Sequence, residues 1–341
     1  MARFPLFRLP MLAITPVVVS MEPLDLINFS SISKRTNALV KNLTPLHIQI
    51  NESSTDSIVL TQHSISEPRQ KRKFISFSIK SCFTAREELV GRQVGKGRPP
   101  IPMHKNNSSG PYETSTYWLA PVFGYTGLLS ILFETLNIGC ISQEFNLDNN
   151  IGLPVHEHVK ELMETESPET LFGTFKFIGK YASPELYQAI LVHYADAMMH
   201  IKVPTDPNFK FDGSQGYPNN NFYASHASWV TVKDLEAMIE SPMLTLQGLK
   251  LKGKEMNGFL KKWMGMRGML GRKMLLGVDG VDMDTVLEGL EVEEKNKVLR
   301  GFNENNPMDC KEIIRADGVA FTIWKDPCSL FMMTSVFADH Y

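Results

Sequence analysis

The sequence has little cysteine, no long apolar run and almost no excess of charge, and each shortage excludes a class of protein. Four cysteines without a CxxC pair exclude a zinc knuckle and a dense disulfide framework. No stretch approaches the roughly 18 apolar residues that a membrane helix needs. The net charge of -2 gives the whole chain no field that would gather nucleic acid or an anionic membrane.

Local catalytic and nucleotide-binding motifs are also missing. The sequence contains no GxSxG, HExxH or Walker A pattern. Segment 95–97 is glycine-rich, but Pro99 removes a backbone donor from a loop that would need every donor to cradle phosphate. Segment 279–284 resembles a calcium loop whose glycine and closing glutamate are misplaced. We therefore predict a protein that is not an enzyme and needs no cofactor or metal. A hydrolase with a dispersed triad stays open as an alternative.

What is present is the composition of a globular protein. The chain has 341 residues, of which 43% are hydrophobic and 21% charged, enough for one large domain or two ordinary ones. Reduced thiols in a cytoplasmic or nuclear protein are the default for so few, scattered cysteines. The expected fold class is α+β, with a small helical module at the amino terminus and a mixed α/β domain behind it.

Residues 4–43 show the pattern of short helices. Pro23 suits a first helical position, Asp25 follows in the first turn, and Ser33 can cap a further helix. Pro16 interrupts the first apolar run, and Thr15 as a cap would restart the helix there. So small a module cannot bury all its apolar faces internally, so it needs a partner within the chain or outside it.

The same terminus also allows a different class of protein, a secreted glycosylated chain. Arg3 and Arg8 precede the apolar run 11–19, as in a secretory signal peptide, and Ser20 is small enough to stand before a cleavage site. Five Asn-x-Ser/Thr triplets begin at Asn28, Asn42, Asn51, Asn106 and Asn107. Such triplets also arise by chance in a chain rich in Asn and Ser, so this reading is kept as the alternative.

The middle of the chain reads as a small antiparallel sheet followed by helices. Strands are expected at 46–51, 58–60 and 74–79, and the Gly, Pro, Ser and Asn content of 93–116 predicts a linker. Helices are expected near 127–136, 156–164 and 183–200, and the last of these starts with Ser183 and Pro184.

The carboxy-terminal third shows a weak strand–helix repeat. Leucines alternate from 244 to 251, and the helix expected at 255–264 has Met256, Phe259, Leu260 and Trp263 on one face. A second strand near 274–276 and a second helix at 282–290 follow. Repeats of about thirty residues are typical of leucine-rich repeats, so we expect degenerate units of that kind.

Two histidine groups were weighed as metal sites. His193, Asp196 and His200 would share one face of the helix expected at 183–200, but two helical turns separate the imidazoles. His156 and His158 alternate around a helix and converge only on a strand. We interpret both groups as ordinary surface or structural residues.

A basic segment between Thr245 and Lys273 has eight cations against one acid, Glu255. Its charge of +7 could dock an acidic partner or RNA, although a solvated outer helix face explains it as well. The run 69–73 is compatible with a nuclear localisation signal, but such runs are more often loops.

Two separated segments resemble one family. The residues from Phe4 to Lys41, including Phe4-Pro-Leu-Phe-Arg-Leu-Pro10 and Met21-Glu-Pro-Leu-Asp-Leu, resemble an F-box of the kind found in the large nematode F-box expansion. Phe209-Lys-Phe-Asp-Gly213, Trp229-Val-Thr-Val-Lys-Asp-Leu235, Asn257-Gly-Phe-Leu-Lys-Lys-Trp263 and Ile314-Arg-Ala-Asp-Gly318 resemble the type 2 F-box-associated domain of the same proteins. Both pieces occur in the expected order.

The resemblance implies the substrate-recognition subunit of a Skp–cullin–F-box ubiquitin ligase. Its domains would be an F-box at 1–44, a mixed region at 45–204 and an F-box-associated domain at 205–341. The residues expected to bind the Skp-type adaptor are Leu9, Pro10, Ile14, Val18, Leu24, Leu26 and Ile32. A protein target of unknown identity would bind the last domain, where Lys250, Lys252 and Lys254 are candidate contacts. The implied partners include neither nucleic acid nor membrane.

Overall fold

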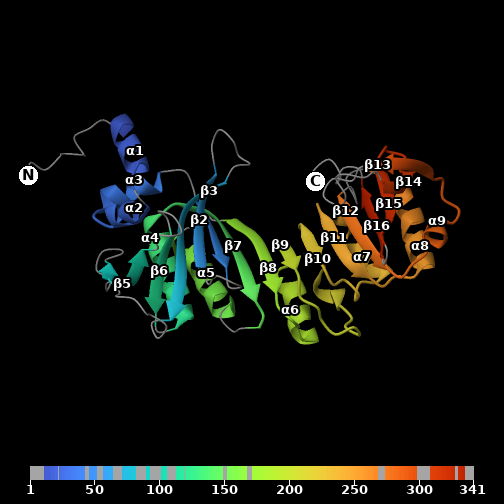
Figure 1. The fold of residues 1–341 in the computed structure, drawn as a ribbon, viewed down its shortest axis with the longest axis horizontal. Helices are drawn as coiled ribbons and strands as arrows, with labels where there is room; N and C mark the ends of the chain where they lie inside the picture. The colour runs from blue at the N-terminus through green and yellow to red at the C-terminus, as the bar shows by residue number, and fades with distance from the viewer. Residues whose placement is uncertain are drawn as a thin grey trace, which may run out of the picture. The chain divides into compact units, whose positions relative to one another are not determined.

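Two compact units make up the protein. The computed structural model describes residues 11–21, 23–42, 46–51, 57–63, 71–81, 90–92, 101–105, 113–118, 120–148, 152–166, 171–267, 273–297, 308–326 and 329–334. Its contacts divide the chain into unit 1, Met1–Gly173, and unit 2, Thr174–Tyr341. Both units combine a sheet with helices, so a mixed α/β fold is confirmed (Figure 1). Within the described ranges, no helix is both long and apolar enough to cross a membrane.

Three short helices open unit 1. They are α1 (Met11–Val19), α2 (Pro23–Ser30) and α3 (Lys34–Lys41). Ser33 caps α3 as expected, because its hydroxyl accepts a hydrogen bond from the Thr36 amide and the Thr36 hydroxyl accepts one from the Ser33 amide. The restart expected at Pro16 is wrong. Helix α1 runs through Pro16, which is exposed, while Ile14 and Val18 anchor the other side of the helix in the core.

The sheet of unit 1 has the strand order β7-β1-β2-β3-β6-β5-β4. Its strands are β1 (Leu46–Asn51), β2 (Ser57–His63), β3 (Lys71–Ser81), β4 (Val90–Arg92), β5 (Ile101–Lys105), β6 (Glu113–Trp118) and β7 (Ile138–Asn146). The expected antiparallel group β1-β2-β3 is confirmed. The linker expected at 93–116 is wrong in part, since it holds β5 and most of β6. Strand β6 pairs in parallel with the distant β3, a non-local partner that local composition does not reveal.

The core of unit 1 joins its amino-terminal helices to the rest of the unit. Helices α4 (Pro121–Thr135) and α5 (Gly152–Glu166) pack together, and α2 and α3 contact α4. The Asn37 side chain donates a 2.9 Å hydrogen bond to the Glu134 carbonyl. One apolar cluster contains residues of α1, α2, α3, α4 and the strands. The boundary predicted at residue 44 therefore does not separate two packed bodies.

Unit 2 is built on a row of parallel strands linked by helices. In chain order its elements are β8 (Leu171–Ile178), α6 (Pro184–His193), β9 (Met198–Ile201), β10 (Phe222–Ala224), α7 (Val232–Ala237), β11 (Leu244–Leu249), α8 (Gly253–Met264), β12 (Met274–Asp279) and α9 (Met283–Leu287). Phe175, Met199, Phe222, Leu244 and Met274 align across the five strands, so the strands recur every 22 to 30 residues. The strand–helix repeat expected for this region is present, and the row of parallel strands begins three strands earlier, at β8, than the sequence suggested.

Antiparallel strands complete the sheet of unit 2. They are β13 (Glu293–Lys297), β14 (Met308–Ile314), β15 (Ala320–Asp326) and β16 (Ser329–Thr334), joined in the order β13-β14-β15-β16-β12. Strand β16 pairs antiparallel with β12, so the parallel array ends there. The predicted boundary at 204 falls inside the loop between β9 and β10, two strands that are hydrogen-bonded neighbours.

The helix predicted at 183–200 is shorter than expected. Ser183 and Pro184 start α6 as predicted, but the helix ends at His193. The Asn219 side chain donates a 2.6 Å hydrogen bond to the Asp196 carboxylate, and the Asn220 side chain donates one to the Asp196 carbonyl. These contacts hold the chain in a turn that leads into β9. Tertiary contacts therefore override the helical pattern of this segment.

Candidate functional site

Loops at the carboxyl ends of the parallel strands line two cavities in unit 2. The longest of them covers 202–221, between β9 and β10, and a second loop leads from β10 to α7. Ligand sites of parallel sheets commonly lie at this end of the strands, because the loops there converge. Side chains that could hold a ligand are therefore expected on these loops.

An aromatic cluster fixes the long loop against the helices. Trp229 lies 6.0 Å from Phe209 and 5.5 Å from Phe211, between ring centroids. Tyr187 of α6 lies 5.3 Å from Phe209, and its hydroxyl accepts a 3.2 Å hydrogen bond from the Trp229 indole. Burial raises the pKa of the Tyr187 phenol, so this hydroxyl stays neutral. The cluster gives the loop a rigid apolar base.

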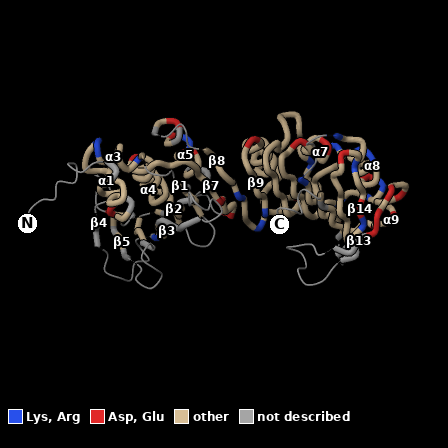
Figure 2. The backbone as a smooth tube through the Cα atoms, turned by 90° about the horizontal axis from the view of Figure 1, so that it is seen from above, with Lys and Arg blue, Asp and Glu red and all other residues tan. Residues whose placement is uncertain are grey.

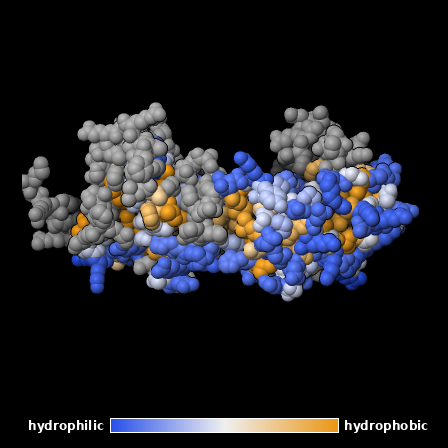
Figure 3. All heavy atoms as spheres, turned by 90° about the horizontal axis from the view of Figure 1, so that it is seen from below, coloured by the Kyte–Doolittle hydropathy of each residue, from blue (hydrophilic) through white to orange (hydrophobic). Residues whose placement is uncertain are grey.

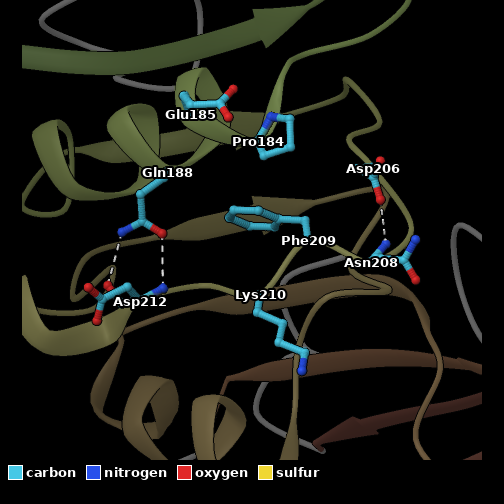
Figure 4. Close-up of a pocket in the computed structure, with 8 residues that line it drawn as sticks. All are labelled: Pro184, Glu185, Gln188, Asp206, Asn208, Phe209, Lys210 and Asp212. Carbon is cyan, nitrogen blue, oxygen red and sulfur yellow. Dashed lines mark hydrogen bonds between the residues drawn. The ribbon is translucent and has the colours of Figure 1, made fainter.

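A cavity of about 380 Å³ opens above this base (Figure 4). Its lining consists of Pro184, Glu185, Gln188, Asp206, Asn208, Phe209, Lys210 and Asp212. The Gln188 amide clamps the loop, because it donates to the Asp212 carbonyl and accepts from the Asp212 amide, both at 2.9 Å. The Asp212 carboxylate accepts from the Ser214 amide, and this hydrogen bond lowers the Asp212 pKa. The walls are thus held in place before any ligand arrives.

A second cavity, of about 630 Å³, adjoins the first and shares Lys210 and Asp212 with it. At its wall the Tyr217 hydroxyl donates a 2.9 Å hydrogen bond to the Asp234 carboxylate. The other oxygen of Asp234 accepts from the amide and hydroxyl of Thr231, at 2.8 and 2.7 Å. Both oxygens of this buried carboxylate accept hydrogen bonds. Asp234 therefore stabilises the cavity wall through Tyr217 and the start of α7 through Thr231.

The Tyr217–Asp234 contact predicts an alkaline dependence of stability. Burial, reinforced by the Asp234 carboxylate, raises the pKa of Tyr217 to about 12. The stabilisation from the neutral phenol is therefore complete below about pH 10 and is lost as the pH rises through about 12. Urea unfolding at pH 9.5 and pH 11 should show a larger loss of unfolding free energy for the wild type than for Tyr217→Phe. Equal losses in the two proteins would contradict this assignment.

The chemistry of the two cavities is that of a binding surface. They offer aromatic rings, amides, exposed carboxylates and the ammonium groups of Lys210 and Lys233. In the part of the chain that the structure describes, no group of three or more His, Cys, Asp or Glu residues is placed to hold a metal ion. His193, Asp196 and His200 do not share a helix face, since α6 ends at His193 and His200 belongs to β9. His158 instead lies 2.8 Å from the Ser130 hydroxyl.

The three lysines proposed as target contacts lie near the start of α8, and none of them lines either cavity. Lys250 forms a 3.1 Å ion pair with Asp279, and Lys252 and Lys254 are exposed. Blue and red segments occur together around α8 and α9 in Figure 2, so acids of neighbouring elements offset part of the basic segment. Lys262, for example, pairs with Glu236 at 2.6 Å. Figure 3 shows a mainly hydrophilic surface over the described atoms of unit 2 on the face viewed.

The residues proposed to bind an adaptor are divided by their exposure. Ile14, Val18 and Leu26 are at most 3% exposed and belong to the core of unit 1. Leu24 is partly buried against that core, whereas Ile32 is 62% exposed. Leu9 and Pro10 lie outside the described residues.

Sequence reasoning missed the aromatic cluster and the cavities. Phe209 and Trp229 entered it only as parts of a family resemblance, because the turn-rich segment after residue 204 was interpreted as the boundary between two predicted domains. The available signal was the presence of aromatic residues in a turn-rich segment. Loops without a structural role seldom bury aromatic rings, and Phe209 is only 8% and Trp229 only 4% exposed.

Comparison with known proteins relates the chain to a nematode protein. It is 25% identical over 335 residues to the Skn-1 dependent zygotic transcript 15 protein of Caenorhabditis elegans, a match that covers 94% of this chain and 93% of that protein. The similarity therefore extends through both units. No protein-family model matches the chain, and no solved structure matches it.

Proposed function

We propose that the protein is the substrate-recruiting subunit of a Skp–cullin ubiquitin ligase. Its amino-terminal helices would bind a Skp-type adaptor and unit 2 would bind the protein to be ubiquitinated. The resemblance of residues 4–41 to an F-box and of segments within 209–323 to an F-box-associated domain supports this proposal. Such a subunit is not itself an enzyme, needs no cofactor, and acts in the cytoplasm or nucleus.

The observation that carries the proposal is the exposure of two large apolar side chains on the amino-terminal helices. Ile32, in the turn between α2 and α3, is 62% exposed, and Val17 of α1 is 39% exposed. Large aliphatic side chains with this much exposure gain free energy when a partner covers them. Leu24 of α2 is partly buried and belongs to the same three helices.

Substitution at this surface tests the proposal without disturbing the core. Removing residues 1–43 would also remove Ile14 and Val18 from the core, so point changes are the sharper choice. We expect Val17→Asp with Ile32→Asp to weaken binding to a purified Skp-type adaptor at least tenfold, since charged groups would have to be buried at the interface. Surface plasmon resonance on the full chain would measure this loss.

A matched control uses an exposed apolar residue elsewhere. Leu171 at the start of β8 is 69% exposed, and Leu171→Asp should leave adaptor binding within twofold of the wild type. Circular dichroism would verify that all variants are folded. If the wild-type chain does not bind the adaptor, or if the double variant binds as well as the wild type, the proposed function is wrong.

The target would be held by unit 2, whose rigid loops and parallel strands offer a broad surface. The candidate contacts Lys250, Lys252 and Lys254 remain a prediction within this proposal. The partial neutralisation of Lys250 by Asp279 makes the other two the stronger candidates for a salt-sensitive encounter.

A further inference from the structure

The parallel strands β8, β9 and β10 bear a row of cationic and aromatic side chains on one face of their sheet. Lys176 of β8 aligns with His200 of β9, and His200 aligns with Tyr223 of β10. Neighbouring residues in each strand, such as Phe177 and Met199, point the other way and are buried. Phe177 lies 5.1 Å from Tyr194, which follows α6 directly. The row therefore lies on the face opposite α6.

Lys202 adds a second ammonium group to this row. It stands two residues after His200, so its side chain lies on the same face, and its amide donates a 2.8 Å hydrogen bond to the Phe177 carbonyl. Its ammonium nitrogen lies 5.7 Å from the centroid of the Tyr223 ring, and the His200 and Tyr223 rings are 5.5 Å apart. We call Lys176, His200, Lys202 and Tyr223 the cationic row.

Both lysines of the cationic row act electrostatically on His200. Burial lowers the His200 pKa most, and Lys202 and then Lys176 lower it further. Lys176 and Tyr223 of the two flanking strands and Lys202 after β9 thus lie around this imidazole. An anion placed between the Lys176 and Lys202 ammonium groups, beside the His200 imidazole, would interact favourably with both positive charges.

We propose that the cationic row binds an extended, acidic segment of a protein, through its Asp or Glu carboxylates. Strands stand about 4.8 Å apart, so the row extends roughly 10 Å from β8 to β10 and can contact more than one carboxylate. Such a strip suits an extended segment better than a small ion, because it is spread along a sheet face rather than folded into a cavity. The Tyr223 ring supplies apolar area for the backbone of the segment. This inference rests on the proposed function, because the acidic segment would belong to the target protein that the ligase recruits.

Binding of a carboxylate beside His200 couples affinity to pH. The bound carboxylate favours the imidazolium, so it raises the His200 pKa from its lowered value in the free protein. The complex therefore takes up protons, and affinity increases as the pH falls. Glutamate side chains, with a pKa of about 4.3, remain ionised throughout the range of pH 6 to 8. We expect an acidic peptide to bind about three- to tenfold more tightly at pH 6 than at pH 8.

The experiment measures fluorescence anisotropy of a labelled nonapeptide of alternating Glu and Gly with the full chain. Lys176→Gln with Lys202→Gln should bind it at least tenfold more weakly, because two charge-assisted contacts are lost. If the double variant does not fold, Lys202→Gln alone tests the same contact, because it changes an exposed residue. His200→Gln should abolish the pH dependence. Lys34→Gln is the matched control, since it removes the same charge from an exposed residue of α3 and should change affinity less than twofold. Lys233→Gln tests the loop cavities as the alternative binding site.

Several results would overturn the inference. They are equal binding of a nonapeptide of alternating Gln and Gly, stronger binding of a phosphoserine peptide at the same lysines, and loss of binding in Lys233→Gln but not in the double variant. The adaptor assay separates this inference from the proposed function. The lysine variants should bind the adaptor normally, and a wild-type chain that binds the acidic peptide but no adaptor would refute the ligase role alone.

Discussion

Replacing Asp317 by alanine is expected to reduce the unfolding free energy of unit 2 by about 3 kcal/mol or more. The Arg315 side chain is completely buried, and its guanidinium donates two hydrogen bonds to the Asp317 carboxylate, at 2.8 and 2.9 Å. The alanine leaves that buried cation without its carboxylate, which costs far more than the loss of an exposed pair. Urea denaturation followed by tryptophan fluorescence would measure the change.

A double variant separates the ion pair from the turn that contains it. Arg315 and Asp317 occupy the tight turn between β14 and β15, where Gly318 has a φ of +84° that favours glycine. Arg315→Met with Asp317→Ala removes both charges and keeps an apolar side chain in the buried position. It should recover much of the lost stability. A double variant as unstable as Asp317→Ala alone would show that the turn, rather than the loss of the carboxylate beside Arg315, determines the cost.

Trp263→Ala should destabilise the protein by about 3–5 kcal/mol, the usual cost of removing a buried tryptophan side chain. Trp263 is 0% exposed, and its ring lies 4.6 Å from Phe321 of β15 and 5.0 Å from the Arg315 guanidinium. The side chain thus joins α8 to the antiparallel strands, and its loss leaves a cavity between them. Thermal unfolding and urea denaturation would both report the change.

The phenylalanine variant is the control for Trp263. Trp263→Phe keeps a ring against Phe321 and fills most of the space, so it should cost less than half as much as the alanine variant. Similar losses in the two variants would contradict the packing role of the indole and its contact with Arg315.

Local patterns predicted the elements whose determinants lie within the element itself. The apolar face of α8 is confirmed, since Met256, Phe259, Leu260 and Trp263 are all buried. The Ser33 cap and the Ser183–Pro184 helix start are confirmed for the same reason. Each depends on side chains within one or two helical turns, so the sequence alone carries the information.

Elements that depend on distant partners could not be predicted in this way. Strand β6 was assigned to a linker because its parallel partner β3 lies far away in the sequence. The end of α6 depends on Asn219 and Asn220, which bind Asp196 from another loop. The cationic row arises only after β8, β9 and β10 come into register, because Lys176 and His200 are 24 residues apart. Such features follow from strand pairing, which periodicity does not determine.

The order of strands in unit 2 also determines where further strand–helix units could be added. An open parallel edge after β12 could accept a further strand–helix unit, but antiparallel pairing with β16 closes that edge. The last strand of the sheet is β13, with the sequence EEKNK, and Glu293 and Glu294 are exposed on it. Charged edge strands resist pairing with another chain, which keeps such sheets from aggregating. Lengthening this protein by duplicating a repeat would therefore require insertion before β12, between units that already stack on each other.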